Sequence, residues 1–254
     1  MLVKHITGLT DADLISNQDL ILTDNQTNLL NAMVSERLSG RPISKIIGRK
    51  EFYGRDFIVN DDVLDPRPDS ETLIEVVLGH ATSRNKDFKI LDMGTGSGCL
   101  ILTLLSELPN ATGIAADISP SALEIARQNA GKLGVHARVQ FIESDWLESI
   151  KGQFDIIISN PPYIESKDID GLDITVSKYD PILALDGGDD GLHPYKVILP
   201  QIRNHLKQNG FLAMEHGVGQ SQSIMEIARN SGLSDVQTHD DLGGRDRVIS
   251  AINK

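Results

Sequence analysis

The chain has 254 residues, of which 24 are basic and 36 acidic, so its formal charge is −12. This length fits one large domain, or one domain with a small appendage. The negative charge argues against broad contact with a phosphate backbone. The single cysteine, Cys99, indicates a reducing compartment. The sequence has no run of eighteen apolar residues and no signal-peptide pattern, so we expect a soluble, cytoplasmic protein without a membrane-spanning segment.

Residues 1–48 are predicted to form a small N-terminal helical domain. A short helix is expected around 11–16. Thr23 and Gln26 then match a capping box, which predicts the start of a longer helix. Apolar residues follow at helical spacing, namely Leu29, Leu30, Met33, Val34 and Leu38. This part is too small to bury a core alone, so we expect it to dock on the rest of the chain or on a partner.

Residues 49–66 are predicted to form a linking β-hairpin, because apolar residues flank Gly54 and turn residues follow at 60–62. Residues 67–254 then form the main domain. Its first predicted element is a helix over 71–79, which begins after Pro66, Arg67 and Pro68.

A glycine-rich turn follows the strand predicted over 88–93 and precedes an apolar helix over 99–107. The turn consists of Gly94, Thr95, Gly96, Ser97 and Gly98. Strand, glycine turn and helix N-terminus form a unit that cradles nucleotides. A dinucleotide loop would have its third glycine one residue later. The spacing here, with an acidic residue in the strand end, resembles the S-adenosylmethionine loop of Rossmann-like methyltransferases. Taken alone, the loop is equally compatible with a plain turn.

Two further strand ends carry side chains suited to a nucleoside. The strand over 112–116 leads into Asp117, where α/β folds place a carboxylate on the ribose hydroxyls. Asp117 is equally suited to capping the helix over 121–132. The strand over 138–142 leads into Asp145 and Trp146, which suit the amino group and the face of an adenine. A lone tryptophan is otherwise a core residue more often than a ligand contact.

The apolar strand over 154–159 runs into Asn160, Pro161, Pro162 and Tyr163. The Asn160 side-chain carbonyl and the Pro161 backbone carbonyl can accept both hydrogens of one planar amino group. The prolines hold these acceptors in place, and the tyrosine ring can cover the planar group. The tetrapeptide alone is compatible with an ordinary turn. Four successive strand ends with suitable chemistry together predict a methyltransferase.

The remaining sequence predicts the rest of an α/β fold. A loop-rich stretch over 165–194 contains a glycine–aspartate run at 186–191, which is either a functional loop or a solvated hinge. The elements expected beyond it are helices over 195–207 and 220–230 and strands over 211–215, 236–238 and 247–252. The result is a Rossmann-like, doubly wound sheet of seven strands. Its last strand is antiparallel, because the connection through Gly243 and Gly244 is too short for a helical crossover.

Several segments resemble the HemK/PrmC family, whose members use S-adenosylmethionine to methylate a glutamine side chain of peptide chain release factors. These segments are 48–53, 66–71, 91–98, 160–164, 184–192 and 215–217. The motif Asn160 to Tyr163, called the slot below, is shared with amino methyltransferases of adenine and guanine. Segments 66–68, 187–191 and 215–217 are more particular to the family. The family usually opens with a longer helical domain, and the equivalent of its first helices is missing here. Either the chain is a short member of the family or its start is assigned late; in both cases we expect the catalytic half to be intact.

The resemblance implies methyl transfer to the amide nitrogen of the glutamine in the release factor Gly-Gly-Gln motif. It assigns the methionine end of the cofactor to Gly94, Thr95, Gly96, Ser97 and Gly98, the ribose to Asp117, and the adenine to Trp146 or Asp145. Asn160 lies between cofactor and substrate, and Arg67 is a candidate at the pocket edge.

The same resemblance assigns the substrate slot to Asn160, Pro161, Pro162 and Tyr163, with Asn160, Pro161 and Tyr163 as the catalytic residues. We expect no metal, no direct nucleic-acid partner and a monomer. The alternative function is an amino methyltransferase that acts on adenine or guanine in nucleic acid.

Overall fold

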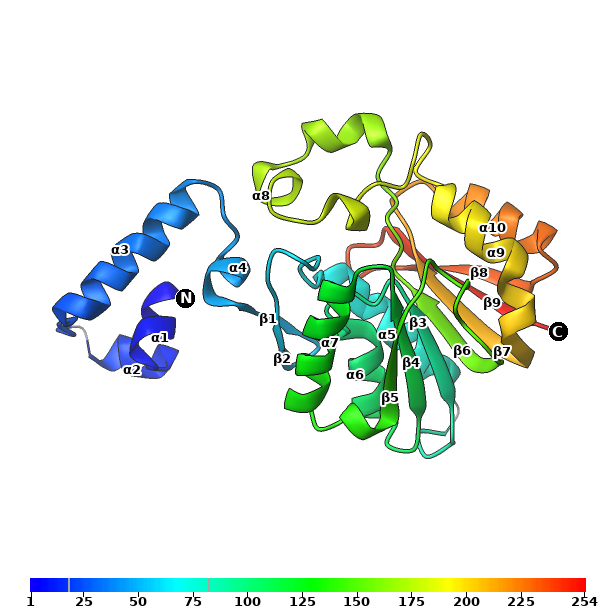
Figure 1. The fold of residues 1–254 in the computed structure, drawn as a ribbon, viewed down its shortest axis with the longest axis horizontal. Helices are drawn as coiled ribbons and strands as arrows, with labels where there is room; N and C mark the ends of the chain where they lie inside the picture. The colour runs from blue at the N-terminus through cyan, green and yellow to red at the C-terminus, as the bar shows by residue number, and fades with distance from the viewer. Residues whose placement is uncertain (18, 82) are drawn as a thin grey trace.

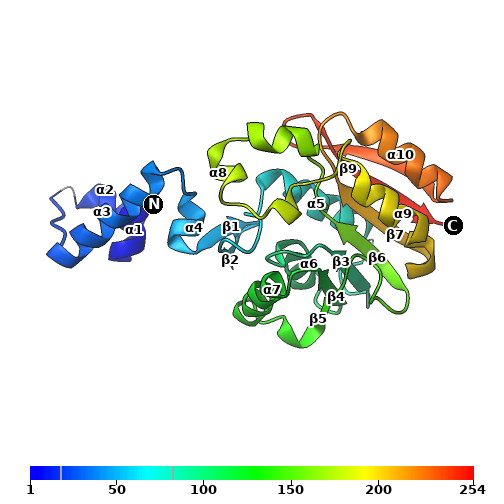
Figure 2. The same cartoon turned by 45° about the horizontal axis from the view of Figure 1, so that its top comes forward.

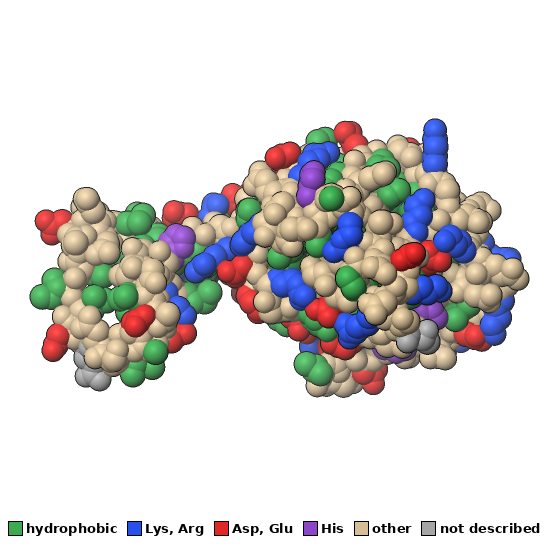
Figure 3. All heavy atoms as spheres, turned by 90° about the horizontal axis from the view of Figure 1, so that it is seen from below, with side chains coloured by type: hydrophobic (Ala, Val, Ile, Leu, Met, Phe, Trp, Pro, Cys, Tyr) green, Lys and Arg blue, Asp and Glu red, His purple; other side chains and the backbone are tan. Residues whose placement is uncertain are grey.

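The computed structural model describes residues 1–17, 19–81 and 83–254. A group of N-terminal helices projects from a larger α/β body that contains the main sheet (Figure 1). Figure 3 shows the narrow junction between these two parts, with acidic and basic side chains interspersed on the visible face. Among the residues described, no helix is long and apolar enough to cross a membrane.

The described residues of the N-terminal part contain four helices, namely α1 (Leu2–Thr7), α2 (Asp11–Ser16), α3 (Asp24–Leu38) and α4 (Ile43–Ile47). The predicted capping box of α3 is present, with the Thr23 backbone N–H donating to Gln26 Oε1 at 3.0 Å. The predicted apolar stripe is mostly uncovered: within α3, which is described throughout, Met33 is the only buried residue. Helices α1 and α4 were not predicted, because both are short and neither has a side-chain cap.

The predicted hairpin follows as β1 (Arg49–Phe52) and β2 (Arg55–Ile58), an antiparallel pair. Phe52 and Phe57 point into the core, where their rings meet edge to face with centroids 6.2 Å apart. The hairpin is also bound to helix α7 (Pro120–Lys132), because the Asn129 side chain accepts from the Ile58 N–H at 2.7 Å and donates to the Ile58 carbonyl at 3.0 Å.

The described part of the main body contains a seven-stranded sheet with the order β5-β4-β3-β6-β7-β9-β8. Its strands are β3 (Lys89–Met93), β4 (Thr112–Asp117), β5 (Val139–Glu143), β6 (Phe154–Ser159), β7 (Leu206–Glu215), β8 (Ser234–Asp240) and β9 (Asp246–Asn253). Strands β3 to β7 pair in parallel, and β9 runs antiparallel to both of its neighbours. The predicted Rossmann-like sheet with an antiparallel last strand is therefore confirmed.

Helices cover both faces of this sheet (Figure 2). Helices α5 (Glu71–His80), α6 (Cys99–Glu107) and α7 lie on one face, and α9 (His193–His205) and α10 (Ser221–Asn230) lie on the other. Neighbouring side chains of one strand join different cores: Ile90 belongs to the first apolar cluster and Leu91 to the second. The helix predicted over 195–207 was too long at its C-terminal end, because β7 begins directly after α9.

The long segment between β6 and α9 contains short helical elements that were not predicted, namely η3 (Ser166–Gly171), α8 (Ile174–Ser177) and η4 (Ile182–Ala184). The smaller turns η1 (Pro68–Ser70) and η2 (His136–Arg138) lie elsewhere in the body. Asp180 anchors the long segment, because its buried carboxylate pairs with Lys45 of α4 at 2.8 Å and with Arg67 at 2.6 Å. This ion-pair group joins the N-terminal helices to the body.

Candidate active site

A cavity of about 300 Å³ opens where β3, β4, β5 and β6 end. The carboxyl ends of parallel strands meet at one edge of the sheet, which is where α/β folds bind ligands. The cavity brings together most of the residues predicted to bind the cofactor, namely Gly94, Thr95, Gly96, Ser97, Asp117, Trp146 and Asn160. Asp145, Pro162 and Arg67 also line it.

The glycine loop turns the chain from β3 into α6 and is tied to the neighbouring strand. Gly94 and Gly96 have φ values of 69° and 54°, which favour glycine. The Thr95 N–H donates to the Ala116 carbonyl at 2.9 Å. Gly98 is not among the lining residues; a Cβ there would lie 2.8 Å from Leu102 Cδ1, so it allows close packing beneath the loop.

Asp92 lies beneath the loop and is completely buried. Its Oδ2 accepts the Thr95 hydroxyl at 2.7 Å, while its Oδ1 has no hydrogen-bond partner among the described residues. Burial raises the pKa of the Asp92 carboxyl to about 7, against the lowering by the Thr95 hydroxyl. The loop therefore rests on a carboxyl that titrates near neutrality.

Asp117 faces the cavity and does not cap the helix that follows it, because Ser119 is the N-cap of α7. Its Oδ2 accepts the Gly96 N–H at 2.8 Å, and its Oδ1 accepts the Ser119 N–H at 2.9 Å. Burial raises the pKa of Asp117, and these backbone donors oppose the shift. Each carboxylate oxygen has a second lone pair, so these bonds leave acceptor capacity for a ligand hydroxyl.

Trp146 is half-buried; it lies in the cavity wall and also packs against the second apolar cluster. Its backbone has a positive φ of 46°, and its carbonyl accepts the Ser144 hydroxyl at 3.0 Å. A Cβ on Gly94 would lie 3.6 Å from the indole ring, so loop and ring are adjacent. Asp145 next to it is exposed.

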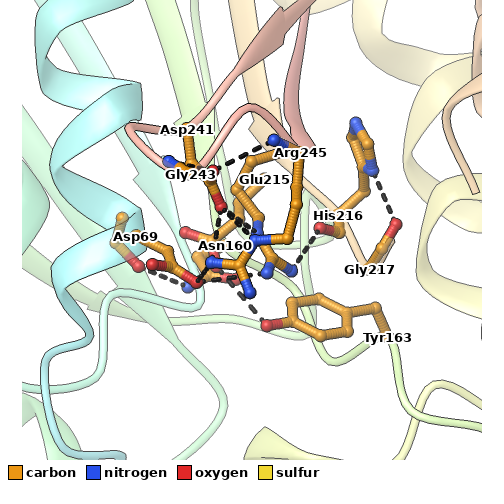
Figure 4. Close-up of polar contacts among 11 residues, drawn as sticks. Asp69, Asn160, Tyr163, Glu215, His216, Gly217, Asp241, Gly243 and Arg245 are labelled. Carbon is orange, nitrogen blue, oxygen red and sulfur yellow. Dashed lines mark hydrogen bonds and ion pairs between the residues drawn. The ribbon is translucent and has the colours of Figure 1, made fainter. Parts of the chain in front are cut away.

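The polar slot follows β6 at the other side of the cavity. The Asn160 amide nitrogen donates to Ser70 Oγ at 3.2 Å, which fixes which end of the amide faces η1. Pro161 is buried, and neither Pro161 nor Tyr163 lines the cavity. The Tyr163 hydroxyl instead points to Glu215 Oε1 at 3.5 Å, and Figure 4 shows Asn160, Tyr163 and Glu215 converging.

The glycine–aspartate run supports the slot from behind. The Gly187 N–H donates to the Ile164 carbonyl at 2.8 Å, and the Gln220 side chain donates to the Tyr163 carbonyl at 2.9 Å. A Cβ on Gly191 would lie 2.5 Å from that same carbonyl. The run is therefore a packed support for Tyr163, which favours the functional interpretation over a solvated hinge.

A group of charged residues lies behind the slot, from β7, β9, η1 and the turn between β8 and β9 (Figure 4). Arg247 pairs with Asp69 at 3.1 Å, and Arg245 pairs with Asp241 at 2.8 Å. Glu215 lies among them and is 1% exposed. Burial raises the pKa of its carboxyl to about 7. Glu215 and Ser70 were not predicted as site residues, although both lie in segments that resemble the family.

Comparison with known proteins agrees with this geometry. Residues 1–48 match the family model of the PrmC N-terminal domain, and residues 68–175 match that of the Methyltransferase small domain. A T. thermophilus 16S rRNA methyltransferase in complex with AdoMet and guanosine is similar in fold, with a TM-score of 0.58 and 16% identity, over 81% of this chain and 50% of that chain.

Two relatives are similar over almost the whole chain. The release factor glutamine methyltransferase of Rhodospirillum rubrum is 39% identical over 251 residues, which cover 99% of this chain and 77% of the relative. That of Agrobacterium fabrum is 39% identical over 253 residues, which cover 98% of this chain and 88% of the relative. A glycine-loop cavity beside an Asn-Pro-Pro-Tyr slot, in a chain this similar to both, leads to one conclusion: the chain belongs to the release factor glutamine methyltransferase family.

Proposed function

We propose that this protein transfers a methyl group from S-adenosylmethionine to the side-chain amide nitrogen of the glutamine in the Gly-Gly-Gln motif of peptide chain release factors. One observation carries the proposal: Asn160 lines the cofactor-sized cavity and begins the Asn-Pro-Pro-Tyr slot, in a chain 39% identical to two release factor glutamine methyltransferases. Residues 1–48, 49–66 and 67–254 are proposed as helical, linking and catalytic parts.

The residues around the cavity fit S-adenosylmethionine, which supplies an activated methyl group on a sulfonium. Gly94 and Gly96 bring bare backbone to the cavity, which suits the methionine end. Asp117 has acceptor capacity for the ribose hydroxyls. The Trp146 ring offers a flat wall for the adenine, and Asp145 an acceptor for its amino group.

Asn160 is proposed to bind and orient the glutamine amide. Because its own nitrogen donates to Ser70, its Oδ1 is directed away from η1 and is available as an acceptor. The Pro161 carbonyl is proposed as the second acceptor for the same amino group. An amide nitrogen is a poor nucleophile, since its lone pair is delocalised. Two fixed acceptors orient it and stabilise the positive charge that develops on it.

Tyr163 is proposed to cover the amide and exclude water. Its backbone is held by Gln220, and its hydroxyl by Glu215. A monomer is proposed as the active form.

Incubation with labelled S-adenosylmethionine tests the proposal directly. Three acceptors are compared: a release factor, ribosomal RNA and DNA. We expect label on the release factor and none on a release factor whose Gly-Gly-Gln glutamine is replaced by alanine. Label on nucleic acid alone would favour the adenine or guanine methyltransferase instead.

A further inference from the structure

The Glu215 carboxyl ends strand β7 directly behind the slot. Its Oε1 accepts the Tyr163 hydroxyl at 3.5 Å, so it touches one wall of the slot. Its Oε2 is buried and has no hydrogen-bond partner in the part of the chain that the structure describes. A buried carboxyl oxygen without a donor is costly, which makes this placement informative.

Ser70 connects this carboxyl to the other wall of the slot. It is 2% exposed, and its Oγ accepts the Asn160 amide N–H at 3.2 Å. A hydroxyl that accepts one hydrogen bond still has its own proton to donate. Ser70 lies beside Glu215, where its hydroxyl lowers the pKa of the carboxyl by favouring the charged form. The Asn160 side chain lowers this pKa as well, so the carboxyl lies beside both the amide and the serine that accepts its N–H.

We propose that Glu215 is a positioning residue for methyl transfer, which acts through Ser70 on the Asn160 amide. This inference rests on the proposed function. In this relay, the Glu215 carboxylate accepts the Ser70 hydroxyl, and the Ser70 oxygen accepts the Asn160 N–H. The amide nitrogen is thereby held toward Ser70, and Oδ1 is directed toward the substrate. The relay also polarises the amide, because hydrogen bonds in series strengthen one another. The polarised Oδ1 is a stronger acceptor where the substrate nitrogen becomes positive.

The charge on Glu215 decides whether this relay operates. The groups that face it are Arg247 of β9, Asp69 and Ser70 of η1, Asn160 and Tyr163 of the slot, Tyr195 of α9 and Cys99 of α6. Burial has the largest effect on its pKa and raises it to about 7; Ser70, Arg247 and Asn160 lower it, and Asp69 raises it. The carboxyl therefore ionises as the pH rises through neutrality, and the relay should strengthen over the same range.

Replacement of the carboxyl tests the relay, with Tyr195→Phe as the matched control. Glu215→Gln keeps the size of the side chain but removes its charge. Tyr195→Phe removes a 2.7 Å hydrogen bond to the Glu215 backbone carbonyl, so it perturbs the same strand end and leaves the carboxyl in place. The measurements are kcat at saturating cofactor and release factor across pH, and calorimetric affinity for S-adenosylhomocysteine.

For Glu215→Gln we expect kcat to fall about 10- to 100-fold, with unchanged affinity for S-adenosylhomocysteine, because the relay acts on the transition state. The rise in wild-type kcat through neutral pH should disappear, and Tyr195→Phe should retain it. Unchanged kcat in Glu215→Gln, or the same loss in Tyr195→Phe, would overturn the proposal.

If Glu215→Gln does not fold, a second variant still tests the relay. Ser70→Ala breaks the relay and leaves the carboxyl intact; wild-type kcat in a Ser70→Ala protein that binds S-adenosylhomocysteine would overturn the relay. The wild-type protein distinguishes a failure of the proposed function from a failure of the Glu215 relay. If it leaves the release factor unlabelled, the proposed function is wrong and the relay falls with it. If it labels the release factor and Glu215→Gln labels it equally fast, the relay alone is wrong.

Discussion

The Asn160 amide nitrogen donates to Ser70 Oγ at 3.2 Å, which joins the end of β6 to the turn before α5. The bond orients an amide that borders both the cavity and the slot. Asn160→Ala should therefore lower kcat about 100- to 1,000-fold, since it removes an acceptor for developing charge. Affinity for S-adenosylhomocysteine should change little. Asn230→Ala, at the exposed end of α10, serves as the control. Equal turnover by Asn160→Ala would contradict the mechanism.

Asp117 supports the cofactor site in two ways, as a proposed ribose ligand and as the acceptor for the Gly96 N–H at 2.8 Å. Asp117→Ala should weaken S-adenosylhomocysteine binding about 10- to 100-fold, which corresponds to about 1.4–2.8 kcal/mol. Asp117→Asn keeps one carbonyl acceptor and should lose less. Calorimetry measures both variants. If Asp117→Ala binds with wild-type affinity, the ribose assignment is wrong.

Gly191 has a positive φ of 67° and no room for a side chain, since a Cβ would lie 2.5 Å from the Tyr163 carbonyl. Gly191→Ala should lower the melting temperature and reduce kcat by displacing Tyr163. Gly134→Ala is the matched control, because Gly134 has a φ of 71° with nothing within 4 Å of a Cβ. It should show the backbone cost alone, about 1 kcal/mol. Similar losses in both variants would show that Gly191 has no specific support role.

Because of Asp92, the free energy of unfolding should fall as the pH rises. Its pKa is about 7 when folded and 3.8 ordinarily, so between these values the unfolded chain releases a proton that the folded chain keeps. This contribution is fully present below about pH 4 and lost as the pH rises through about 7. Asp92→Asn cannot ionise, so its free energy of unfolding should rise relative to that of the wild type by about 3 kcal/mol between about pH 5 and 8. Thermal melts at both pH values measure this gain. A difference that does not depend on pH would contradict the raised pKa.

The sequence predicted those parts of the fold that depend on local pattern. Strand β6 and helix α6 were predicted to the residue, since each is an apolar run bounded by a strong stop signal at Asn160 or Gly98. The junction at Leu206 was misplaced, because the chain passes from α9 to β7 without any turn residue. The apolar stripe of α3 predicted a helix correctly but not its exposure, since periodicity does not say whether a partner surface exists within the chain.

In the candidate site, too, some residues were predictable from local pattern and others were not. The cavity residues were predictable because parallel strands place their ends together, so Asp117, Trp146 and Asn160 meet whatever the details of packing. The contacts of Ser70 with Asn160 and of Tyr163 with Glu215 join residues far apart in sequence. They depend on how η1 and β7 pack behind the slot, and no local signal encodes that.

The position of the transferred methyl group distinguishes methylation of a release factor glutamine from every alternative. A release factor is incubated with S-adenosylmethionine and the protein, and its peptides are then sequenced by mass spectrometry. We predict one added methyl group on the side-chain amide of the Gly-Gly-Gln glutamine, with strong loss of that product for Asn160→Ala. A methyl group on any other residue, or an unmodified release factor beside methylated nucleic acid, would contradict it.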